Sequence, residues 1–408
     1  MKKVNILLAF LFIASFAWSQ NTKDKTMDVK VDVVYLSSNL LEGRSTGTPG
    51  EQMAAEYIAK RFKDLGLKPM GTDGKYFQYF DFNYKNNPHV ENNGEKRTGK
   101  NVVAYLDNNA KNTVVIGAHY DHLGHGDFGS LYTGGDEIHN GADDNASGVA
   151  TVLYLAEKLK SEGPKNNNYL FIAFSGEEMG LFGSKYFVEH PTIDIKSINY
   201  MVNMDMVGRL NEEKVVVING AGTSPVWKET FPKIKSELSL KTSDSGIGPS
   251  DHTSFYLNEI PAIHFFTGQH SDYHKPSDDS ELVNYDGIVT ISEFIYDLIS
   301  KIDKKGKIEF TKTKDENEGK QAAAFKVTLG VMPDYVYQGE GMRIDGVMEG
   351  RPAEVAGMEK GDIVIKIGDL DVKDIYDYME GLGKYKKGDT TRVAVKRGDK
   401  VMVKNVTF

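Results

Sequence analysis

The chain has 408 residues, 40% of them hydrophobic and 26% charged, a balance typical of globular domains and unlike that of disordered or collagen-like chains. Its 49 Lys and Arg against 58 Asp and Glu give a net charge of −9, which argues against a nucleic-acid partner. It has no cysteine, so disulfides, thiolate metal sites and a catalytic thiol are excluded. Any metal ion must therefore be bound by His, Asp and Glu.

The N-terminus has the pattern of a secretory signal peptide. Two lysines precede an uncharged apolar run from Ile6 to Trp18, and Ala17 and Ser19 supply small residues before a cleavage site. The run is short for a membrane span, and no other stretch reaches that length. We predict a signal peptide over residues 1–19, an exported protein that is periplasmic or secreted, and no stable membrane span after signal removal. An uncleaved anchor or a buried helix is the alternative.

Residues 20–302 alternate short apolar strands with amphipathic helices. Several strands are continuous apolar runs, as expected when both faces of a sheet are covered. The alternation predicts an α/β fold with a mostly parallel central sheet and helices on both faces. The predicted strands are 102–106, 114–118, 169–174, 200–204, 215–218 and 262–266, and the predicted helices are 51–65, 147–160, 226–238 and 288–302.

The composition changes after this region. Residues 303–320 are polar with few apolar side chains, which predicts an interdomain linker. The remaining residues, 321–408, predict a small, separate β-rich domain. Its expected strands are 325–331, 341–347, 363–367 and 392–396, and its expected helix is 375–382.

Ionisable side chains gather at or just after the ends of predicted strands in residues 20–302. In α/β sheets, ligands bind outside the carboxyl ends of the strands. Imidazoles with carboxylates and no thiolate suit Zn²⁺ or a similar divalent ion, and more ligands are present than one ion needs. We therefore predict two ions that share a carboxylate. The six positions are His119, Asp144, Glu177, Glu178, Asp205 and His274.

In this hypothesis the adjacent glutamates, Glu177 and Glu178, have different roles. One carboxylate can bind a metal ion while its neighbour takes a proton from water held between the ions, as hydrolysis of an amide requires. A glutamate pair taken alone is more often a solvated surface, so the interpretation depends on the whole set lying at strand ends. We interpret His122 and His125, which are close to His119, as structural or surface residues.

Six short motifs follow one another in the same region: AHYDHLG, GADDNASG, FSGEEMGLFGS, NMDMVG, SDHTSF and DYHKPSD. Together, over residues 33–302, they resemble the di-zinc aminopeptidases of the bacterial leucyl aminopeptidase and aminopeptidase Y type. The resemblance implies the zinc exopeptidase fold and two Zn²⁺ per chain. It implies that Asp144 bridges both ions, that His119 and Asp205 complete one site, and that Glu178 and His274 complete the other.

The same resemblance implies roles for neighbouring residues. Glu177 would be the general base, and Asp121 would orient the imidazole of His119 from behind. Tyr273 would hydrogen-bond the oxyanion. The peptide bond after Asp144 is commonly cis in this family. Asp251, in SDHTSF, matches a family motif, and we assign it no ligand role.

The C-terminal domain has its own resemblance. TLGVMPDY and GMRIDGVMEGRPAEVAGMEKGDIVIKIGDLDV are similar to a bacterial PDZ domain over residues 321–408. The resemblance implies a loop whose backbone N–H groups capture a peptide or protein C-terminus, while the peptide adds as a strand. A β-rich domain that only packs against the catalytic unit is the alternative. The loop residues would be Thr328, Leu329, Gly330 and Val331.

We therefore expect an exported zinc-dependent metalloaminopeptidase, acting on peptides through a metal-bridged hydroxide, with a C-terminal PDZ domain. Three alternatives stay open. A carboxypeptidase or dipeptidase could use the same scaffold, because the metals cut the bond while the surrounding pocket selects the terminus. A glutaminyl cyclase uses a related fold with one zinc. A non-catalytic peptide-binding protein would work through its PDZ domain alone.

Overall fold

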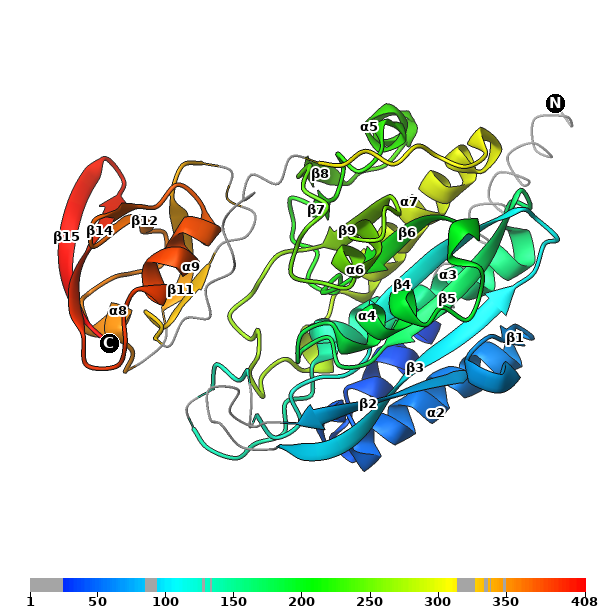
Figure 1. Ribbon diagram of the computed structural model, residues 1–408, viewed down its shortest axis with the longest axis horizontal. Coiled ribbons are helices and arrows are strands. Elements are labelled where there is room, and N and C mark those ends of the chain that lie inside the picture. Colours follow the sequence, from blue (N-terminus) through cyan, green and yellow to red (C-terminus); the bar gives the residue numbers. More distant parts are fainter. Residues whose placement is uncertain are drawn as a thin grey trace, which may run out of the picture. The chain divides into compact units, whose positions relative to one another are not determined.

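The computed structural model describes residues 25–84, 94–126, 129–132, 134–313, 327–333, 337, 339–347 and 350–408 (Figure 1). These residues form two units, which are described separately. The larger unit comprises 25–84, 94–267 and 274–312, and the smaller comprises 268–273 and 313–408. The predicted signal peptide lies outside the described residues.

The larger unit is built on one mixed β-sheet (Figure 1). Its strands in the described residues are β1 (Lys68–Pro69), β2 (Phe77–Tyr84), β3 (Glu95–Leu106), β4 (Asn112–His119), β5 (Asn167–Phe174), β6 (Ile198–Met204), β7 (Val215–Asn219), β8 (Ser239–Thr242) and β9 (Ala262–Phe266). They are ordered β1-β3-β5-β4-β6-β9-β7-β8, with β2 paired to β3. The central strands β5, β4, β6 and β9 are parallel, and antiparallel pairs flank them.

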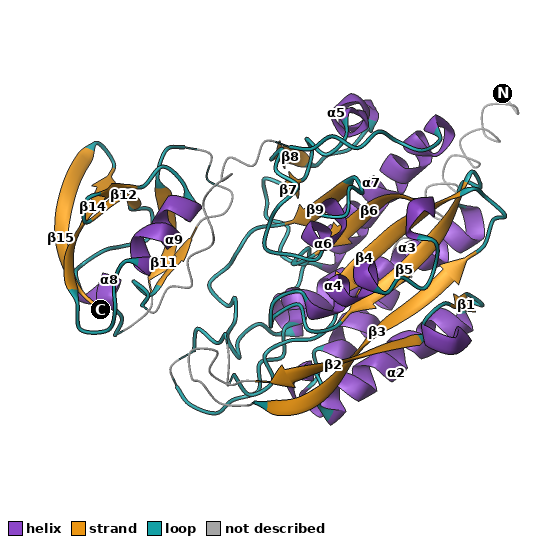
Figure 2. Cartoon of the chain, in the orientation of Figure 1, coloured by secondary structure: helices purple, strands orange, loops and turns teal. Residues whose placement is uncertain are grey.

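Helices cover both faces of this sheet (Figure 2). Alternate residues of a strand point to opposite faces, so Val102 packs with one helix layer and Val103 with the other. Every residue of β5 is buried as a result, which explains its continuous apolar run. The predicted α/β fold is confirmed. One layer contains a helix over 25–36, α2 (Pro49–Asp64), α3 (Gly148–Glu162), α5 (Pro225–Thr230) and α7 (Tyr285–Ile302), and the other contains α4 (Phe182–Glu189) and α6 (His252–Tyr256).

Local chemistry explains where α2 and α5 begin and end. The Thr48 hydroxyl accepts a hydrogen bond from the N–H of Glu51 at 3.4 Å, and Pro49 occupies the first turn of α2, where its missing N–H does no harm. The prediction of one helix over 226–238 is wrong. The α-helix ends at Thr230 because Pro232 cannot donate the hydrogen bond that would extend it.

The smaller unit is β-rich over the residues described from 327 onwards. Its strands are β10 (Val331–Pro333), β11 (Met342–Val347), β12 (Ile363–Ile367), β13 (Leu370–Asp371), β14 (Thr390–Arg397) and β15 (Lys400–Thr407). They form an antiparallel sheet ordered β10-β11-β12-β14-β15, with β13 paired to β12. The short helix α8 (Pro352–Val355) and the helix α9 (Ile375–Gly383) complete it, and Leu382 of α9 packs in the core with Val364 and Val393.

Part of the predicted linker packs against the larger unit. Ile308 is buried, and the carboxylate of Asp303 accepts hydrogen bonds from the side chains of Asn166 and Asn167. Residues 314–320 of the predicted linker lie outside the described residues, so the domain boundary stays a prediction.

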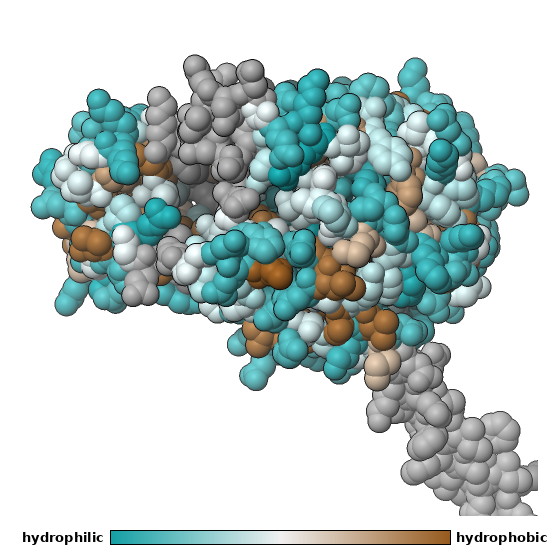
Figure 3. Space-filling model, turned by 90° about the horizontal axis from the view of Figure 1, so that it is seen from below, coloured by the Kyte–Doolittle hydropathy of each residue, from teal (hydrophilic) through white to brown (hydrophobic). Residues whose placement is uncertain are grey.

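The surface in Figure 3 is mainly hydrophilic, and its apolar side chains gather in small patches. Among the described residues, the helices are too short or too polar for any of them to cross a bilayer.

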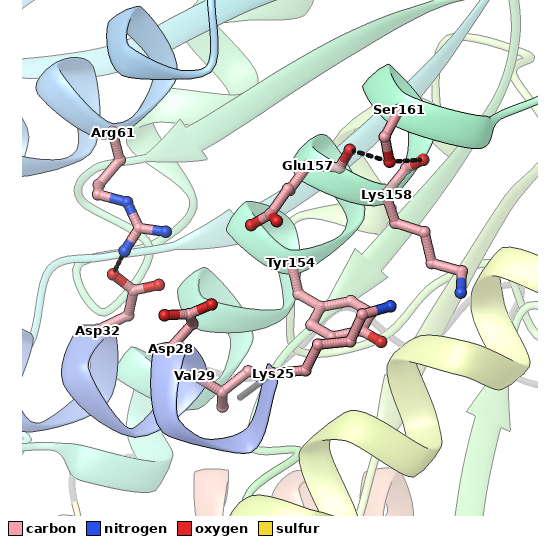
Figure 4. A pocket seen from close by; sticks show the side chains of 9 residues that line it. All are labelled: Lys25, Asp28, Val29, Asp32, Arg61, Tyr154, Glu157, Lys158 and Ser161. Carbon is pink, nitrogen blue, oxygen red and sulfur yellow. Dashed lines mark hydrogen bonds and ion pairs between the residues drawn. The ribbon is translucent and has the colours of Figure 1, made fainter. Parts of the chain in front are cut away.

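A small pocket between the helix 25–36, α2 and α3 contains a buried carboxylate (Figure 4). Asp32 is 2% exposed, forms an ion pair with Arg61 and accepts a hydrogen bond from the Tyr57 hydroxyl at 2.6 Å. Burial raises the pKa of Asp32 to about 6, although Arg61 and Tyr57 act in the opposite direction.

We expect Asp32 to make stability fall as pH rises. Its pKa is about 6 in the folded protein against an ordinary value of 3.8, so the folded state holds the proton more tightly. The contribution of Asp32 to stability is therefore largest below about pH 4 and declines through pH 6, by up to about 3 kcal/mol. Urea unfolding of Asp32→Asn should lack this decline, whereas Asp64→Asn, at an exposed carboxylate on α2, should keep it. An identical pH slope in Asp32→Asn and the wild type would contradict the assignment.

Candidate metal centre

The parallel strands bring the predicted site residues to one edge of the sheet. His119 is the last residue of β4, Asp205 follows the end of β6, and the glutamates 177 and 178 lie just beyond the end of β5. Asp144 lies in the irregular π-helical segment Ala142–Ser147 that leads into α3, and His274 lies in the loop after β9. Because the carboxyl ends of parallel neighbours share one edge, these distant positions meet there.

Asp144 stands between two groups of ligating atoms. Its Oδ1 lies 3.3 Å from Nε2 of His119, which is 3.2 Å from Oδ1 of Asp205. Its Oδ2 lies 3.3 Å from Nε2 of His274, which is 3.1 Å from Oε2 of Glu178. The two oxygens of one carboxylate thus face two different histidine–carboxylate pairs. This is the arrangement that a carboxylate shared by two ions requires.

The imidazoles are held so that their Nε2 atoms face the carboxylates. Nδ1 of His119 lies 3.2 Å from the carbonyl oxygen of Asp121, and Nδ1 of His274 lies 2.8 Å from that of Gly129. A carbonyl oxygen at Nδ1 fixes the ring orientation that leaves Nε2 for a metal ion. Burial alone would lower the pKa of His119, but Asp205 and Glu177 outweigh it and raise that pKa well above its usual range. The carboxylates around His119 therefore favour a positive charge at its Nε2. Imidazoles and carboxylates in this arrangement are suitable ligands for zinc.

His122 also lies in the site, although sequence reasoning placed it outside. The ring is buried, and its Nδ1 is 2.7 Å from Oε1 of Glu178 and 3.9 Å from Oδ2 of Asp144. With these two carboxylates, His122 forms a group of atoms that could hold a metal ion, in addition to the group that contains His274. Its position three residues after His119, directly beyond the strand end, was the available signal. His125, by contrast, is half-exposed and pairs with Asp136 at 2.7 Å, which fits its interpretation as a surface residue.

Asp121 contacts both the metal ligand and the predicted base. Its carboxylate is buried, with Oδ1 3.6 Å from Nδ1 of His119. The same Oδ1 accepts a hydrogen bond from the N–H of Glu177 at 3.2 Å. Asp121 thus lies on the Nδ1 side of His119 and is hydrogen-bonded to the backbone of Glu177.

The two adjacent glutamates have opposite electrostatic environments. Burial raises the pKa of Glu177 well above its usual range, and Asp205 and Asp251 add to the effect while His119 opposes it. Burial and Asp144 would also raise the pKa of Glu178, but the imidazoles of His274 and His122 hold it at about 2. Glu178 is therefore a permanent anion suited to ligation, and Glu177 is a carboxylate that can gain and lose a proton.

The other two residues singled out beside the site are Asp251 and Tyr273. Asp251 is fully buried at the start of α6, and burial raises its pKa to about 7. Tyr273 is partly exposed and belongs to the segment 268–273, outside the larger unit, so its role stays a prediction. The peptide bond between Asp144 and Asn145 is cis, as the resemblance implies.

Two domain families match the chain. Residues 101–299 match the model described as peptidase family M28, and residues 308–407 match a PDZ domain model. The chain contains a peptidase family M28 domain followed by a PDZ domain.

Known relatives of the M28 domain include aminopeptidases. Aminopeptidase YwaD of Bacillus subtilis is 29% identical over 178 residues, covering 41% of this chain and 39% of that protein. BSAP, a zinc aminopeptidase from Bacillus subtilis, has a crystal structure that matches with a TM-score of 0.54 at 19% identity, over 70% of this chain and 95% of that one. The glutaminyl cyclase of Porphyromonas gingivalis matches with a TM-score of 0.53 at 16% identity, over 69% and 98%. These two structural matches show the fold alone, and the chain spans less than half of YwaD.

The PDZ domain contains the predicted loop 328–331. Leu329 is fully buried, and Gly330 has φ +72° with its N–H donating to the Thr328 hydroxyl at 3.0 Å. A Cβ on Gly330 would lie 2.1 Å from Cβ of Arg351, so glycine is required there. Thr328 and Arg351 line a cavity together with Lys387, so two cationic side chains lie within its otherwise apolar and neutral polar lining.

We expect metal removal to destabilise the M28 domain. Without a cation, the carboxylates around Asp144 repel one another in a buried site. Zinc present at 100 times its dissociation constant would stabilise the fold by about 3 kcal/mol, or about 5–10 °C in Tm. Thermal unfolding with a chelator should show this loss, and zinc should restore it. A chelated protein with no residual metal and an unchanged Tm would contradict the site, and His274→Ala should show a smaller chelator effect.

Proposed function

We propose that this chain is a zinc-dependent metalloaminopeptidase that removes N-terminal residues from peptides and binds two Zn²⁺. The observation that carries the proposal is Asp144, whose two oxygens face two separate histidine–carboxylate pairs. The M28 match and relatives named aminopeptidases support it. His119, Asp144 and Asp205 would hold one ion, and Asp144, Glu178 and His274 the other.

The roles of the chain's own residues follow from their environments. When bound, zinc supplies Lewis acidity, which makes water a better nucleophile at neutral pH and polarises the scissile carbonyl. Glu177 takes the proton of the attacking water and returns it to the leaving amine, since its raised pKa suits both steps. Asp121 holds the backbone N–H of Glu177 and so keeps the base in place. Tyr273 would hydrogen-bond the developing oxyanion.

The specificity for an N-terminus is supported by the named relatives and by the excess of carboxylates, which favours a cationic substrate end. A panel of amino-acid p-nitroanilides against peptides cleavable at the C-terminus separates an aminopeptidase from a carboxypeptidase or dipeptidase. One zinc per chain together with cyclisation of N-terminal glutamine would instead identify a glutaminyl cyclase, whose fold this chain shares. Peptide binding without hydrolysis would indicate a non-catalytic protein.

The sequence pattern of residues 1–19 supports export of this enzyme to the periplasm or the medium. N-terminal sequencing of the mature protein tests this, with Gln20 as the expected first residue.

Substitution of the two glutamates should separate base from ligand. Glu177→Gln should retain both zinc ions and lose about 10²–10⁴-fold in kcat, because a neutral amide cannot accept the proton. Glu178→Gln is the matched control, one residue away, and should lose zinc instead. Metal content by atomic absorption and kcat on an amino-acid p-nitroanilide measure both effects. Wild-type activity in a fully metallated Glu177→Gln would show that Glu177 is not the base.

We also propose that the PDZ domain binds the free carboxylate of a peptide or protein C-terminus beside Thr328, next to Arg351 and Lys387. In the full-length chain, Arg351→Gln should weaken binding of such a peptide about tenfold, since one charge-assisted hydrogen bond contributes about 1.5 kcal/mol. Fluorescence anisotropy measures the affinity, with Lys366→Gln on β12 as the control. Equal binding of a peptide and its C-terminal amide would contradict the proposal.

A further inference from the structure

A short segment over 43–51 contacts both loops that carry the proposed zinc ligands. It precedes residue 101, where the match to the M28 family begins. Its backbone pairs with the loop after β4, because the N–H of Gly124 donates to the carbonyl of Gly43 at 3.0 Å. The approach is close: a Cβ on Gly43, which has φ +67°, would lie 2.5 Å from the carbonyl oxygen of Gly124 and 2.6 Å from that of His139.

Arg44 joins the two ligand loops through backbone carbonyls. The side chain is 1% exposed. Its Nε donates to the carbonyl of Tyr120 at 2.8 Å, and its Nη1 and Nη2 donate to those of Asn140 at 2.6 Å and Gly141 at 3.0 Å. A further bond from Nη1 to the carbonyl of Leu36 ties the same guanidinium to the end of the helix 25–36.

These carbonyls are next to the ligands in the chain. Tyr120 directly follows His119, and Gly141 is three residues before Asp144. A guanidinium is planar and its N–H groups point in fixed directions, so it sets the spacing of the two loops more rigidly than an ammonium could. Nε2 of His119 and Oδ1 of Asp144, which lie 3.3 Å apart, belong to the two loops that Arg44 joins.

Thr46 makes a second connection from the same segment. Its hydroxyl donates to Oδ2 of Asp121 at 3.1 Å, and Oδ1 of that carboxylate accepts the N–H of Glu177 and faces His119. Thr46 and Asp121 are both buried. The segment therefore reaches the proposed base as well as the ligands.

We propose that the segment 43–51 positions the metal centre, with Arg44 fixing the two ligand loops and Thr46 fixing Asp121. The inference rests on the proposed function, because it concerns the geometry of the zinc ligands. Neither residue touches substrate or metal; both are positioning residues. Metal ligands tolerate errors of only about 0.2 Å, so a small change in loop spacing weakens binding.

The test compares metal binding with stability. Metal-free protein is prepared for the wild type, Arg44→Met, Arg44→Lys and Arg61→Met, and titrated with Co²⁺ and, by competition with a chromophoric chelator, with Zn²⁺. Both Arg44 variants should bind about 10–100-fold more weakly and shift the visible absorption bands of bound cobalt. The lysine variant keeps the charge but cannot reach both loops. Arg61→Met, which breaks the buried ion pair with Asp32, should lower Tm while leaving affinity and spectrum unchanged.

Each outcome decides the inference. Folded Arg44→Met with wild-type affinity and spectrum would overturn it, as would full rescue in Arg44→Lys, because charge alone would then suffice. If Arg44→Met does not fold, Thr46→Val gives the answer: its cobalt bands should shift and its kcat should fall severalfold at nearly unchanged Tm, and wild-type values would overturn the inference. A wild type that binds no cobalt would overturn the proposed function and this inference together, whereas wild-type binding with unchanged variants overturns the inference alone.

Discussion

The constraint on which this structure depends is the gathering of several buried and partly buried carboxylates at one edge of a sheet. Asp144, Glu178 and Asp205 lie with their oxygens close to shared imidazole nitrogens, and Glu177 and Asp251 add further acidic groups around them. Removing even one charge from water costs several kcal/mol unless a partner offsets it. Three histidines, His119, His122 and His274, and the buried Arg44 supply part of the compensation. Divalent ions would supply the rest. The excess of negative charge that destabilises the metal-free site would therefore favour the binding of cations.

Two parts of the chain build this site in different ways. The parallel strands β4, β5 and β6 determine at which edge of the sheet the site lies, because His119, the glutamate pair and Asp205 all lie at or just after the carboxyl ends of these strands. Strand ends alone leave the loops beyond them free to move. The segment 43–51 reaches these loops from outside the sheet, through the carbonyls that Arg44 binds. Arg44 and Thr46, which make these contacts, are both buried.

Much of this could be predicted from the sequence, because strand ends and residue chemistry are local signals. The apolar runs gave the central strands, and the ligating residues beyond them were visible as motifs. Several features were missed, His122 among them, and three of the others have clear physical reasons. The helix prediction over 226–238 followed apolar spacing and ignored Pro232. The strand β2 is half-exposed and has no continuous apolar run, so its signal is weak. Arg44 lies in a polar stretch that suggests surface, and only the tertiary approach of several backbone carbonyls makes its burial favourable.

The fold by itself does not choose among the chemistries of its neighbours, because a zinc aminopeptidase and a glutaminyl cyclase both superpose on this chain. Whichever of these chemistries applies, two adjacent glutamates on one short turn lie in opposite electrostatic environments. His122 and His274 hold the pKa of Glu178 at about 2, while burial and Asp205 push that of Glu177 upward. Neighbours on the backbone thus have carboxylates whose pKa values are shifted in opposite directions. His122 increases this difference, because it contacts Glu178 at 2.7 Å, whereas Glu177 is surrounded by the acidic residues Asp205 and Asp251.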